Sequence, residues 1–330
     1  MSRVLITGGA GFVGVHLARR LLADGHTVDL VDDFSRGSED AELRAMRADD
    51  GVRLLEADLR RPDALAAVGD GPTHVVHLAA IVGVANVLDR PLAVLYDNVA
   101  LLHGVVDWAR RLPGLERLLF ASTSEVYAGS LEAFDLPVPT PESVSIALPD
   151  LGHPRTSYML SKLYGEAICH QSGVPFTIVR PHNVYGPRMG LSHVIPELLM
   201  RAHAAADGDD LEVWSVEHRR TFCFVEDAVE LIARALLAPA CAGETVNVGA
   251  PGPEVAIGDV ARLIAEIVGR RIRIVPRPPT PGSPARRCAD MTKAIALTGH
   301  EPRVGLEEGI ARTYDWYRAH AFERAGAATT

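Results

Sequence analysis

The sequence predicts an α/β protein: a doubly wound parallel sheet, followed by a smaller mixed α/β lobe in the C-terminal half. Three observations support this prediction. In the first half, short β-branched runs alternate with helical patterns, which is typical of βαβ units. These runs are almost continuously apolar, as expected for strands covered by helices on both faces. After Arg180 the pattern changes, because Pro181, Pro187 and Pro196 interrupt regular structure.

The predicted elements follow from these patterns in chain order. Sheet strands are expected at Arg3–Thr7, Thr27–Val31, Val52–Glu56, His74–Leu78, Arg117–Ala121, Phe176–Val179 and Thr245–Val248. Helices are expected near Phe12–Ala23, Pro62–Val68, Pro91–Arg111, Ser157–Gln171, Val194–Ala206, Val225–Leu237 and Ile257–Val268. The proline-rich run 276–282 is predicted to be a surface loop. We therefore expect one domain from residues 1–180 with about 225–250, and a second lobe from 181–224 and 251–330.

The composition excludes several classes of protein. The 330 residues are 48% hydrophobic with a net charge of -9, which suits a soluble globular protein and argues against a nucleic-acid partner. No secretory signal fits before Val4, and the longest uncharged apolar stretch is too short to cross a bilayer. We therefore expect a cytoplasmic protein with no membrane partner. The 4 cysteines and 13 histidines lack ligand spacing, so no metal is expected.

A glycine-rich turn joins the first predicted strand to the first helix. Gly8, Gly11 and Gly14 have the spacing that provides a tight turn, close approach to a pyrophosphate and close helix–strand packing. Backbone N–H groups at the helix start, at Phe12 and Val13, would receive the phosphates. This context, strand then turn then helix, indicates a Rossmann dinucleotide site.

The ends of the next strands extend this site. Asp32 ends the second strand, where a carboxylate can bind the adenine ribose hydroxyls and would repel a 2′-phosphate. NAD is therefore favoured over NADP, although the nearby Arg36 keeps NADP open. Asp58 closes the third strand, where it could reach the adenine amino group. The small residues of His77-Leu78-Ala79-Ala80 would let a flat cofactor lie against the end of the fourth strand.

Two further motifs indicate catalysis. Tyr158 and Lys162 are expected on one helix face, because four residues turn an α-helix by about 400°. A lysine there can lower the pKa of the phenol, which then serves as an acid/base for a sugar or alcohol hydroxyl. The run Ser122-Thr123-Ser124-Glu125 follows the fifth strand, at the sheet edge where ligands bind. Its hydroxyls could bind a substrate hydroxyl, and Glu125 could act as a general base.

Together these motifs resemble the extended short-chain dehydrogenase/reductase family of nucleotide-sugar epimerases, dehydratases and decarboxylases. The resemblance covers nearly the whole chain and implies NAD as the cofactor, a nucleotide-diphosphate sugar as the substrate, and a homodimer formed through the helices near 91–111 and 157–171. The cofactor-binding residues that it implies are Gly8, Gly11, Phe12, Val13, Gly14, Asp32, Asp58, Leu59, Leu78, Ala79, Ala80, Asn98 and Lys162.

The resemblance also implies individual roles. Tyr158 would take a proton from the sugar 4-hydroxyl while hydride passes to NAD. Lys162 would bind the nicotinamide ribose and lower the tyrosine pKa, and Thr123 would hold the same hydroxyl. The implied substrate-binding residues are Asn183 on the phosphate side, Arg188, and the diphosphate-clamping Arg220 and Arg287.

The exact reaction stays open at this point. The triplet Thr123-Ser124-Glu125 resembles the Thr-x-Glu of UDP-glucuronate decarboxylases and of sugar 4,6-dehydratases. We expect UDP-glucuronate decarboxylation first, with UDP-sugar or UDP-uronate 4-epimerisation and 4,6-dehydration as alternatives. Two residues depart from the decarboxylase pattern, since Ala128 stands where Gly is usual and His182 where Phe is common. The stretch 129–153 is longer than expected and is predicted to cover the sugar site.

Overall fold

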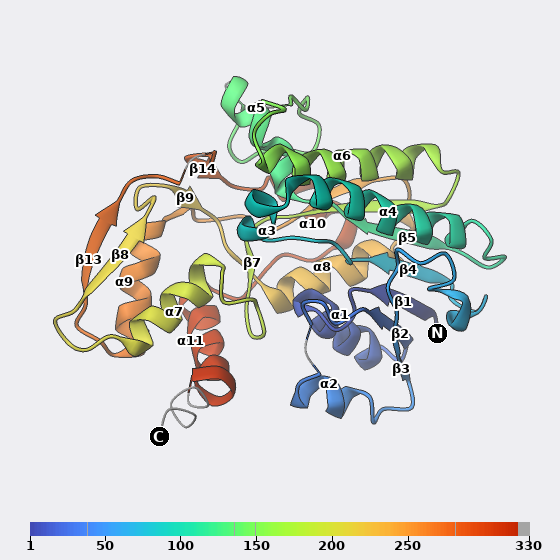
Figure 1. Cartoon of the computed structure of the whole chain (residues 1–330), viewed down its shortest axis with the longest axis horizontal. Coiled ribbons are helices and arrows are strands. Elements are labelled where there is room, and N and C mark those ends of the chain that lie inside the picture. Colours follow the sequence, from blue (N-terminus) through green and yellow to red (C-terminus); the bar gives the residue numbers. More distant parts are fainter. Residues whose placement is uncertain (38, 135, 149, 281, 323–330) are drawn as a thin grey trace.

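The computed structural model describes residues 1–37, 39–134, 136–148, 150–280 and 282–322. Its centre is a seven-stranded sheet with the order β11-β6-β5-β4-β1-β2-β3, in which every pair is parallel (Figure 1). The predicted doubly wound parallel sheet is therefore confirmed. Its strands are β1 (Arg3–Thr7), β2 (Thr27–Asp32), β3 (Val52–Glu56), β4 (His74–His77), β5 (Arg117–Ala121), β6 (Phe176–Pro181) and β11 (Thr245–Val248).

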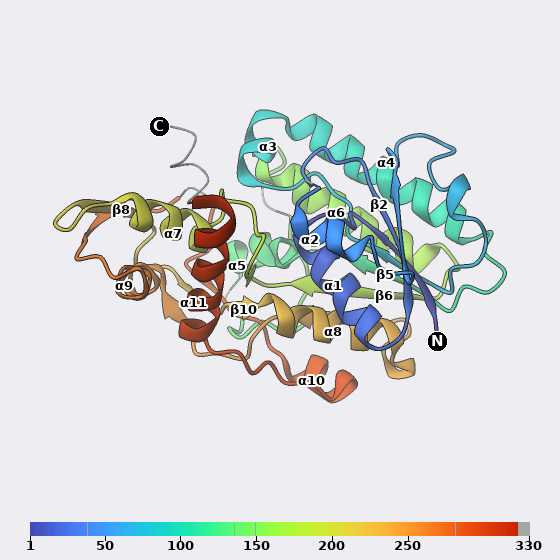
Figure 2. The same cartoon turned by 90° about the horizontal axis from the view of Figure 1, so that it is seen from below.

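Helices cover both faces of this sheet. α4 (Pro91–Ala109) and α6 (Arg155–Gln171) pack together on one face, and α1 (Phe12–Ala23) and α8 (Val225–Leu237) on the other (Figures 1 and 2). Successive strand residues point to opposite faces, so Leu5 belongs to the core under α4 and α6, whereas Val4 and Ile6 belong to the core under α1 and α8. This double burial explains why the strands are apolar throughout.

The smaller lobe lies beyond the carboxyl ends of the strands (Figures 1 and 2). It contains the helices α7 (Val194–Ala204), α9 (Ile257–Val268) and α11 (Leu306–Tyr317). Three small sheets accompany them. They pair β8 (Asp210–Trp214) with β13 (Arg273–Arg277), β7 (Val184–Tyr185) with β10 (Cys223–Phe224), and β9 (Arg219–Arg220) with β12 (Val255–Ala256) and β14 (Arg286–Arg287).

Two element predictions are wrong in detail. The segment 62–68 forms successive turns and a short 3-10 helix, Ala66–Val68, because no side chain caps its start and Gly69, with a φ of +77°, ends it. The expected loop 276–282 begins later, since Pro276 and Arg277 belong to β13. That strand pairs only with β8, and a proline is tolerated in such an edge strand. Pro281 lies outside the described residues.

Several short elements were not predicted from the sequence. They are α2 (Ala41–Met46), α3 (Val84–Asp89), α5 (Ala128–Ala133), α10 (Thr292–Thr298), the 3-10 helices Ser124–Tyr127 and Pro239–Cys241, and the π-helical turn Arg318–Phe322. The terminal helix α11 was missed as well. Within the described ranges no helix is long and apolar enough to cross a membrane, and no group of three or more His, Cys, Asp or Glu side chains could hold a metal ion.

Candidate functional site

The glycine turn between β1 and α1 leaves no room for side chains. Gly8 has a left-handed φ of +70°, and a Cβ there would lie 2.9 Å from the backbone nitrogen of Ala79 at the end of β4. A Cβ at Gly14 would collide with the carbonyl oxygen of Gly8. The turn is therefore closed tightly against both the helix and the neighbouring strand, as a pyrophosphate site requires.

Asp32 lies beside this turn at the carboxyl end of β2. Its carboxylate accepts hydrogen bonds from the backbone N–H of Ala10 (3.0 Å) and of Phe34 (2.9 Å). Burial raises the pKa of Asp32, and these two hydrogen bonds oppose the rise. A glycine cradle and a fixed carboxylate on the adjacent strand together fit a dinucleotide with a free ribose hydroxyl, such as NAD.

The other predicted cofactor residues lie around the same edge. Leu78, Ala79 and Ala80 follow β4 directly, and Leu59 is buried after β3. The Asp58 carboxylate pairs with Arg60, with Nε and Oδ1 2.8 Å apart. Asn98 on α4 accepts from the Ile81 N–H at 2.7 Å and donates to the Ser161 hydroxyl at 3.2 Å. Asn98 therefore ties the end of β4 to helix α6.

Tyr158 and Lys162 lie next to each other on α6. The Lys162 ammonium is buried, 5.8 Å from the centre of the Tyr158 ring, and it donates a 2.8 Å hydrogen bond to the carbonyl oxygen of Ala121 at the end of β5. Burial lowers the pKa of Lys162 to about 8. The spacing of the two residues thus places both at the carboxyl edge of the sheet.

The net pKa of Tyr158 in this structure is set mainly by burial. The pKa of Tyr158 is raised, by burial first and then by the negative charge of Glu125, while hydrogen bonding with Thr123 and the charge of Arg36 oppose the rise. The cost of burying a charged phenolate exceeds the stabilisation that Thr123 and Arg36 give it. The Lys162 ammonium donates its hydrogen bond to a backbone carbonyl.

Glu125 lies at the start of a short 3-10 helix that Thr123 caps through a 3.2 Å hydrogen bond from the Glu125 N–H. Its carboxylate pairs with Arg287 of β14, with Nη1 and Oε1 2.8 Å apart. Burial would raise the pKa of Glu125, but the charge and hydrogen bond of Arg287, followed by the charges of Arg155 and Arg220, lower it below its usual value. The carboxylate is therefore ionised among three arginines.

Arg220 and Arg287 lie side by side, because β9 and β14 pair them in register. The Arg220 guanidinium is buried and donates to backbone carbonyls, including that of Ala285 at 3.1 Å, and burial lowers its pKa to about 10. Arg155, the third arginine around Glu125, was not predicted from the sequence. It precedes Tyr158 by one helical turn, and that spacing was the signal available.

The other two predicted substrate residues lie in different places. Asn183 donates a 2.9 Å hydrogen bond to the carbonyl oxygen of Thr221. Arg188 lies on the cofactor side, where its Nε pairs with Asp40 at 2.6 Å and its Nη1 donates to the carbonyl oxygen of Gly11 at 3.4 Å. The structure thus brings Arg220 and Arg287 together and leaves Arg188 at the glycine turn.

A buried polar network behind Tyr158 was also missed. Glu166, one turn after Lys162 on α6, accepts two hydrogen bonds from Arg180 of β6 (2.9 and 2.7 Å) and one from Ser122 (2.5 Å). Arg180 also donates to the Tyr127 hydroxyl at 2.8 Å. The network fixes the segment that carries Thr123 and Glu125 against the helix that carries Tyr158.

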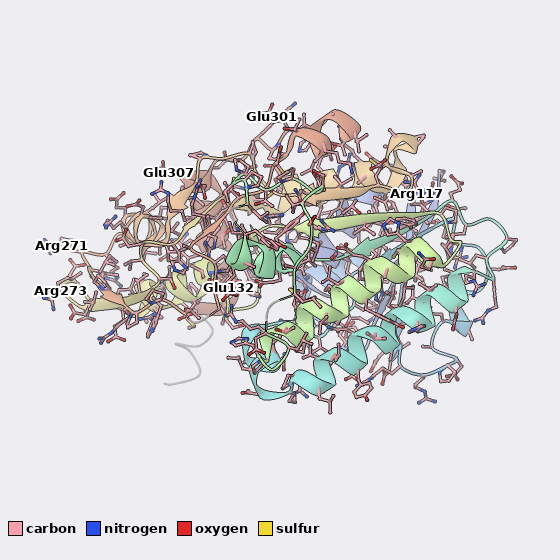
Figure 3. All side chains as sticks on the ribbon, turned by 90° about the horizontal axis from the view of Figure 1, so that it is seen from above. Arg117, Glu132, Arg271, Arg273, Glu301 and Glu307 are labelled. Atoms are coloured by element: carbon pink, nitrogen blue, oxygen red, sulfur yellow. The ribbon has the colours of Figure 1, made fainter. Side chains whose placement is uncertain are left out.

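The long stretch 129–153 is attached beside the same cluster. It begins with α5, whose Ser130 hydroxyl donates to the carbonyl oxygen of Ser145 at 2.8 Å, and Figure 3 shows this helix beside α6, with Glu132 marking it. Thr140 forms a parallel bridge with Ala289, two residues after Arg287. Asp135 and Pro149 lie outside the described residues.

Other charged groups lie far from the cluster. Lys293, the second lysine, pairs with Glu244 at 2.7 Å and lines an open cavity of about 530 Å³ beside β11, which contains none of the predicted site residues. Arg271 and Arg273 lie at the outer end of the smaller lobe (Figure 3), where they pair with Asp207 and Asp210.

Comparison with known proteins agrees with the resemblance. Residues 4–249 match the model of the NAD dependent epimerase/dehydratase family. The chain is 31% identical to the UDP-N-acetyl-alpha-D-glucosaminuronate decarboxylase of Bacillus cytotoxicus, covering 96% of this chain and 98% of that protein. It is 34% identical to UDP-glucuronic acid decarboxylase 1 of Xenopus tropicalis, covering 96% and 72%. The solved UDP-glucose 4-epimerase of Thermotoga maritima, with UDP-glucose, has a TM-score of 0.83 at 26% identity, covering 96% and 99%.

Proposed function

Because the chain belongs to the NAD-dependent epimerase/dehydratase family, we propose that it decarboxylates a UDP-linked uronate, with UDP-glucuronate as the first candidate. The observation that supports this most is the pairing of Glu125 with Arg287 near Tyr158. The Arg287 Nε is buried and has no hydrogen-bond partner among the described residues. A guanidinium with an unused buried donor suits the carboxylate of a uronate.

The cofactor that we propose is NAD, held by residues 1–180 with 225–250, while residues 181–224 and 251–330 bind the nucleotide sugar. The fixed carboxylate of Asp32 beside the glycine turn supports this choice over NADP. NAD bound there would supply a hydride acceptor for C4 of the sugar and a hydride donor for the later reduction.

Side chains of the protein transfer the protons and orient the carboxylate. Thr123 holds the 4-hydroxyl, and the Tyr158 phenolate accepts the proton of that hydroxyl as C4 is oxidised. With a ketone at C4, the bond between C5 and the carboxylate breaks, CO₂ leaves, and the electron pair passes into the enolate of the ketone. C5 then takes up a proton, and Tyr158 returns a proton to the C4 oxygen as the ketone is reduced. Arg287, which the resemblance implies on the diphosphate, orients the carboxylate in this proposal.

A 4-epimerase is the second candidate, supported by the similarity over 96% of the chain to the T. maritima UDP-glucose 4-epimerase. Thr123, Tyr158 and Lys162 serve both reactions, because they act on the C4 hydroxyl. The reactions differ only after the ketone forms. The arginine cluster around Glu125 favours a uronate over a neutral hexose as the substrate, since a hexose offers it no charge to bind.

The test is product analysis by NMR after incubation of the purified enzyme and NAD with a substrate panel. The panel contains UDP-glucuronate, UDP-N-acetylglucosaminuronate, UDP-glucose and dTDP-glucose. Decarboxylation yields CO₂ and a UDP-pentose or its N-acetylated counterpart, and Tyr158→Phe should abolish it. Conversion of the uronates without CO₂ release would replace the proposal with a 4-epimerase, and a deoxy 4-ketone from a hexose would indicate a 4,6-dehydratase.

A further inference from the structure

Two arginines lie over the glycine turn that joins β1 to α1. The first is Arg188, in the loop between β7 and α7. Its side chain is 5% exposed and pairs with Asp40, in the loop that follows β2, with Nε and Oδ2 2.6 Å apart. The same guanidinium donates to the carbonyl oxygen of Gly11, the N-cap residue that precedes helix α1. Arg188 therefore ties the smaller lobe to both loops that border the glycine turn.

The backbone at Arg188 is held in a strained conformation. Its φ of +67° lies in the left-handed region, which is uncommon for a residue other than glycine or asparagine. Hydrogen bonds to the residues before and after Arg188 maintain this conformation. Nε2 of His16, on α1, lies 3.1 Å from the carbonyl oxygen of Pro187, and the hydroxyl of Tyr317, on α11, donates to the carbonyl oxygen of Met189. Because a carbonyl only accepts, Nε2 of His16 carries the proton. Strain that is maintained in this way is typical of functional positions.

The neighbours of Asp40 favour its charged form. Burial would raise its pKa, but the hydrogen bond from Arg188 and those from backbone N–H groups lower it below its ordinary value. Its other oxygen accepts from the Leu43 N–H at 2.9 Å and so caps helix α2. The pair is therefore a partly buried ion pair with both members fixed.

The second arginine, Arg36, extends from the loop after β2 toward Gly83 and Gly190. It follows β2, yet its Nη2 lies 4.0 Å from the positions that a Cβ would take at Gly83, after β4, and at Gly190, after Arg188. The sheet order is β4-β1-β2, so this side chain passes over the end of β1, where the glycine turn lies. Arg36 and Arg188 thus enclose the turn from two sides.

We propose that Arg188 and Asp40 form a latch that retains NAD in its cleft, with Arg36 covering the turn, and that Arg188 does not bind the nucleotide sugar. The inference rests on the proposed function in one respect: an enzyme that takes a hydride from its substrate and returns it must keep the cofactor between the two steps. The latch closes the loops on either side of the glycine turn, and NAD leaves when these loops separate.

The test measures cofactor release from the holoenzyme without any sugar. The enzyme is loaded with isotope-labelled NAD, freed of unbound label, and chased with excess unlabelled NAD, and the retained label is followed over time. Two variants open the latch. Asp40→Asn removes the charge and keeps a helix cap, and Arg188→Asn suits the left-handed backbone. Both should release NAD at least about tenfold faster than the wild type, because loss of one member of a buried charge pair acts mainly on dissociation.

A matched control is Glu230→Gln, which weakens the pairing of Arg20 on α1 with Glu230 on α8, away from the cleft. It should release NAD at the wild-type rate. UDP affinity, measured by calorimetry, should be unchanged in Arg188→Asn. The latch is refuted if both variants release NAD as slowly as the wild type, or if Arg188→Asn weakens UDP binding alone. If Arg188→Asn does not fold, Asp40→Asn decides the question. Since no substrate turns over, failure of the decarboxylase proposal would not alter these results.

Discussion

Arg287 donates to Glu125 across 2.8 Å and so joins the smaller lobe to the segment that follows β5. Both groups are charged. The arginine lowers the pKa of the glutamate, and the negative charge of the glutamate raises the pKa of Tyr158. The pair therefore links the arginine that we propose to bind the sugar to the protonation of the tyrosine. A substrate carboxylate that engages Arg287 would enter a site that is already organised for an anion.

Replacing Arg287 with Met should selectively impair the turnover of uronates. A hydrogen bond to a charged group contributes about 1.5–3 kcal/mol, so we expect kcat/KM for UDP-glucuronate to fall by about 10- to 100-fold. Steady-state kinetics of CO₂ release would measure this. Arg271→Met, at the far end of the lobe, serves as the control and should behave as the wild type. Equal activity of Arg287→Met and the wild type would remove the carboxylate-binding role.

Replacing Lys162 with Met should abolish catalysis and stabilise the fold at pH 7 by about 1–2 kcal/mol, since a buried ammonium is removed. The pKa of Lys162 is about 8 in the folded protein, against 10.5 for an ordinary lysine. Between these values the unfolded chain holds a proton that the folded protein has released, so wild-type stability rises with pH. Urea unfolding from pH 7 to 10.5 should show the advantage of the variant shrinking across that window. A constant difference would contradict this explanation.

Replacing Glu166 with Gln should destabilise the protein by about 3–5 kcal/mol, because it leaves the buried Arg180 guanidinium without its carboxylate. Chemical denaturation would measure the loss. The double variant Glu166→Leu, Arg180→Met should recover part of it, since neither buried charge then remains. If Glu166→Gln is as stable as the wild type, the network does not hold α6 against β6.

We propose that the chain forms a homodimer through α4 and α6, and one variant should prevent it. Leu92 and Tyr96 on α4 and Tyr164 on α6 are exposed by 64%, 68% and 48%, which is unusual for large apolar side chains on neighbouring helices. Figure 3 shows the two helices lying side by side across the sheet. Tyr96→Glu should shift the protein from dimer to monomer in light scattering. Leu148→Glu, exposed outside these helices, should leave the assembly unchanged. A wild-type monomer would refute the proposal.

Local patterns were sufficient to predict most of the sheet. Strands covered on both faces must be apolar, and the glycine at 14 is required by backbone contacts with Gly8 and Gly9 in the same turn. The short helices were not predictable, because α5 depends on contacts such as that of Ser130 with Ser145 rather than on helical periodicity. Arg155 was missed for the same reason, since its relation to Glu125 is set by tertiary packing.

The sequence by itself determined the parallel sheet, the dinucleotide turn and the adjacency of Tyr158 and Lys162, because each depends on spacings shorter than one βα unit. Only the tertiary structure decided the partners of the arginines. Arg188 pairs with Asp40, which lies 148 residues away, and Arg287 pairs with Glu125 across the two lobes. It also decided that the pKa of Tyr158 is raised, because desolvation depends on everything packed around a group and not on the lysine four residues along the helix.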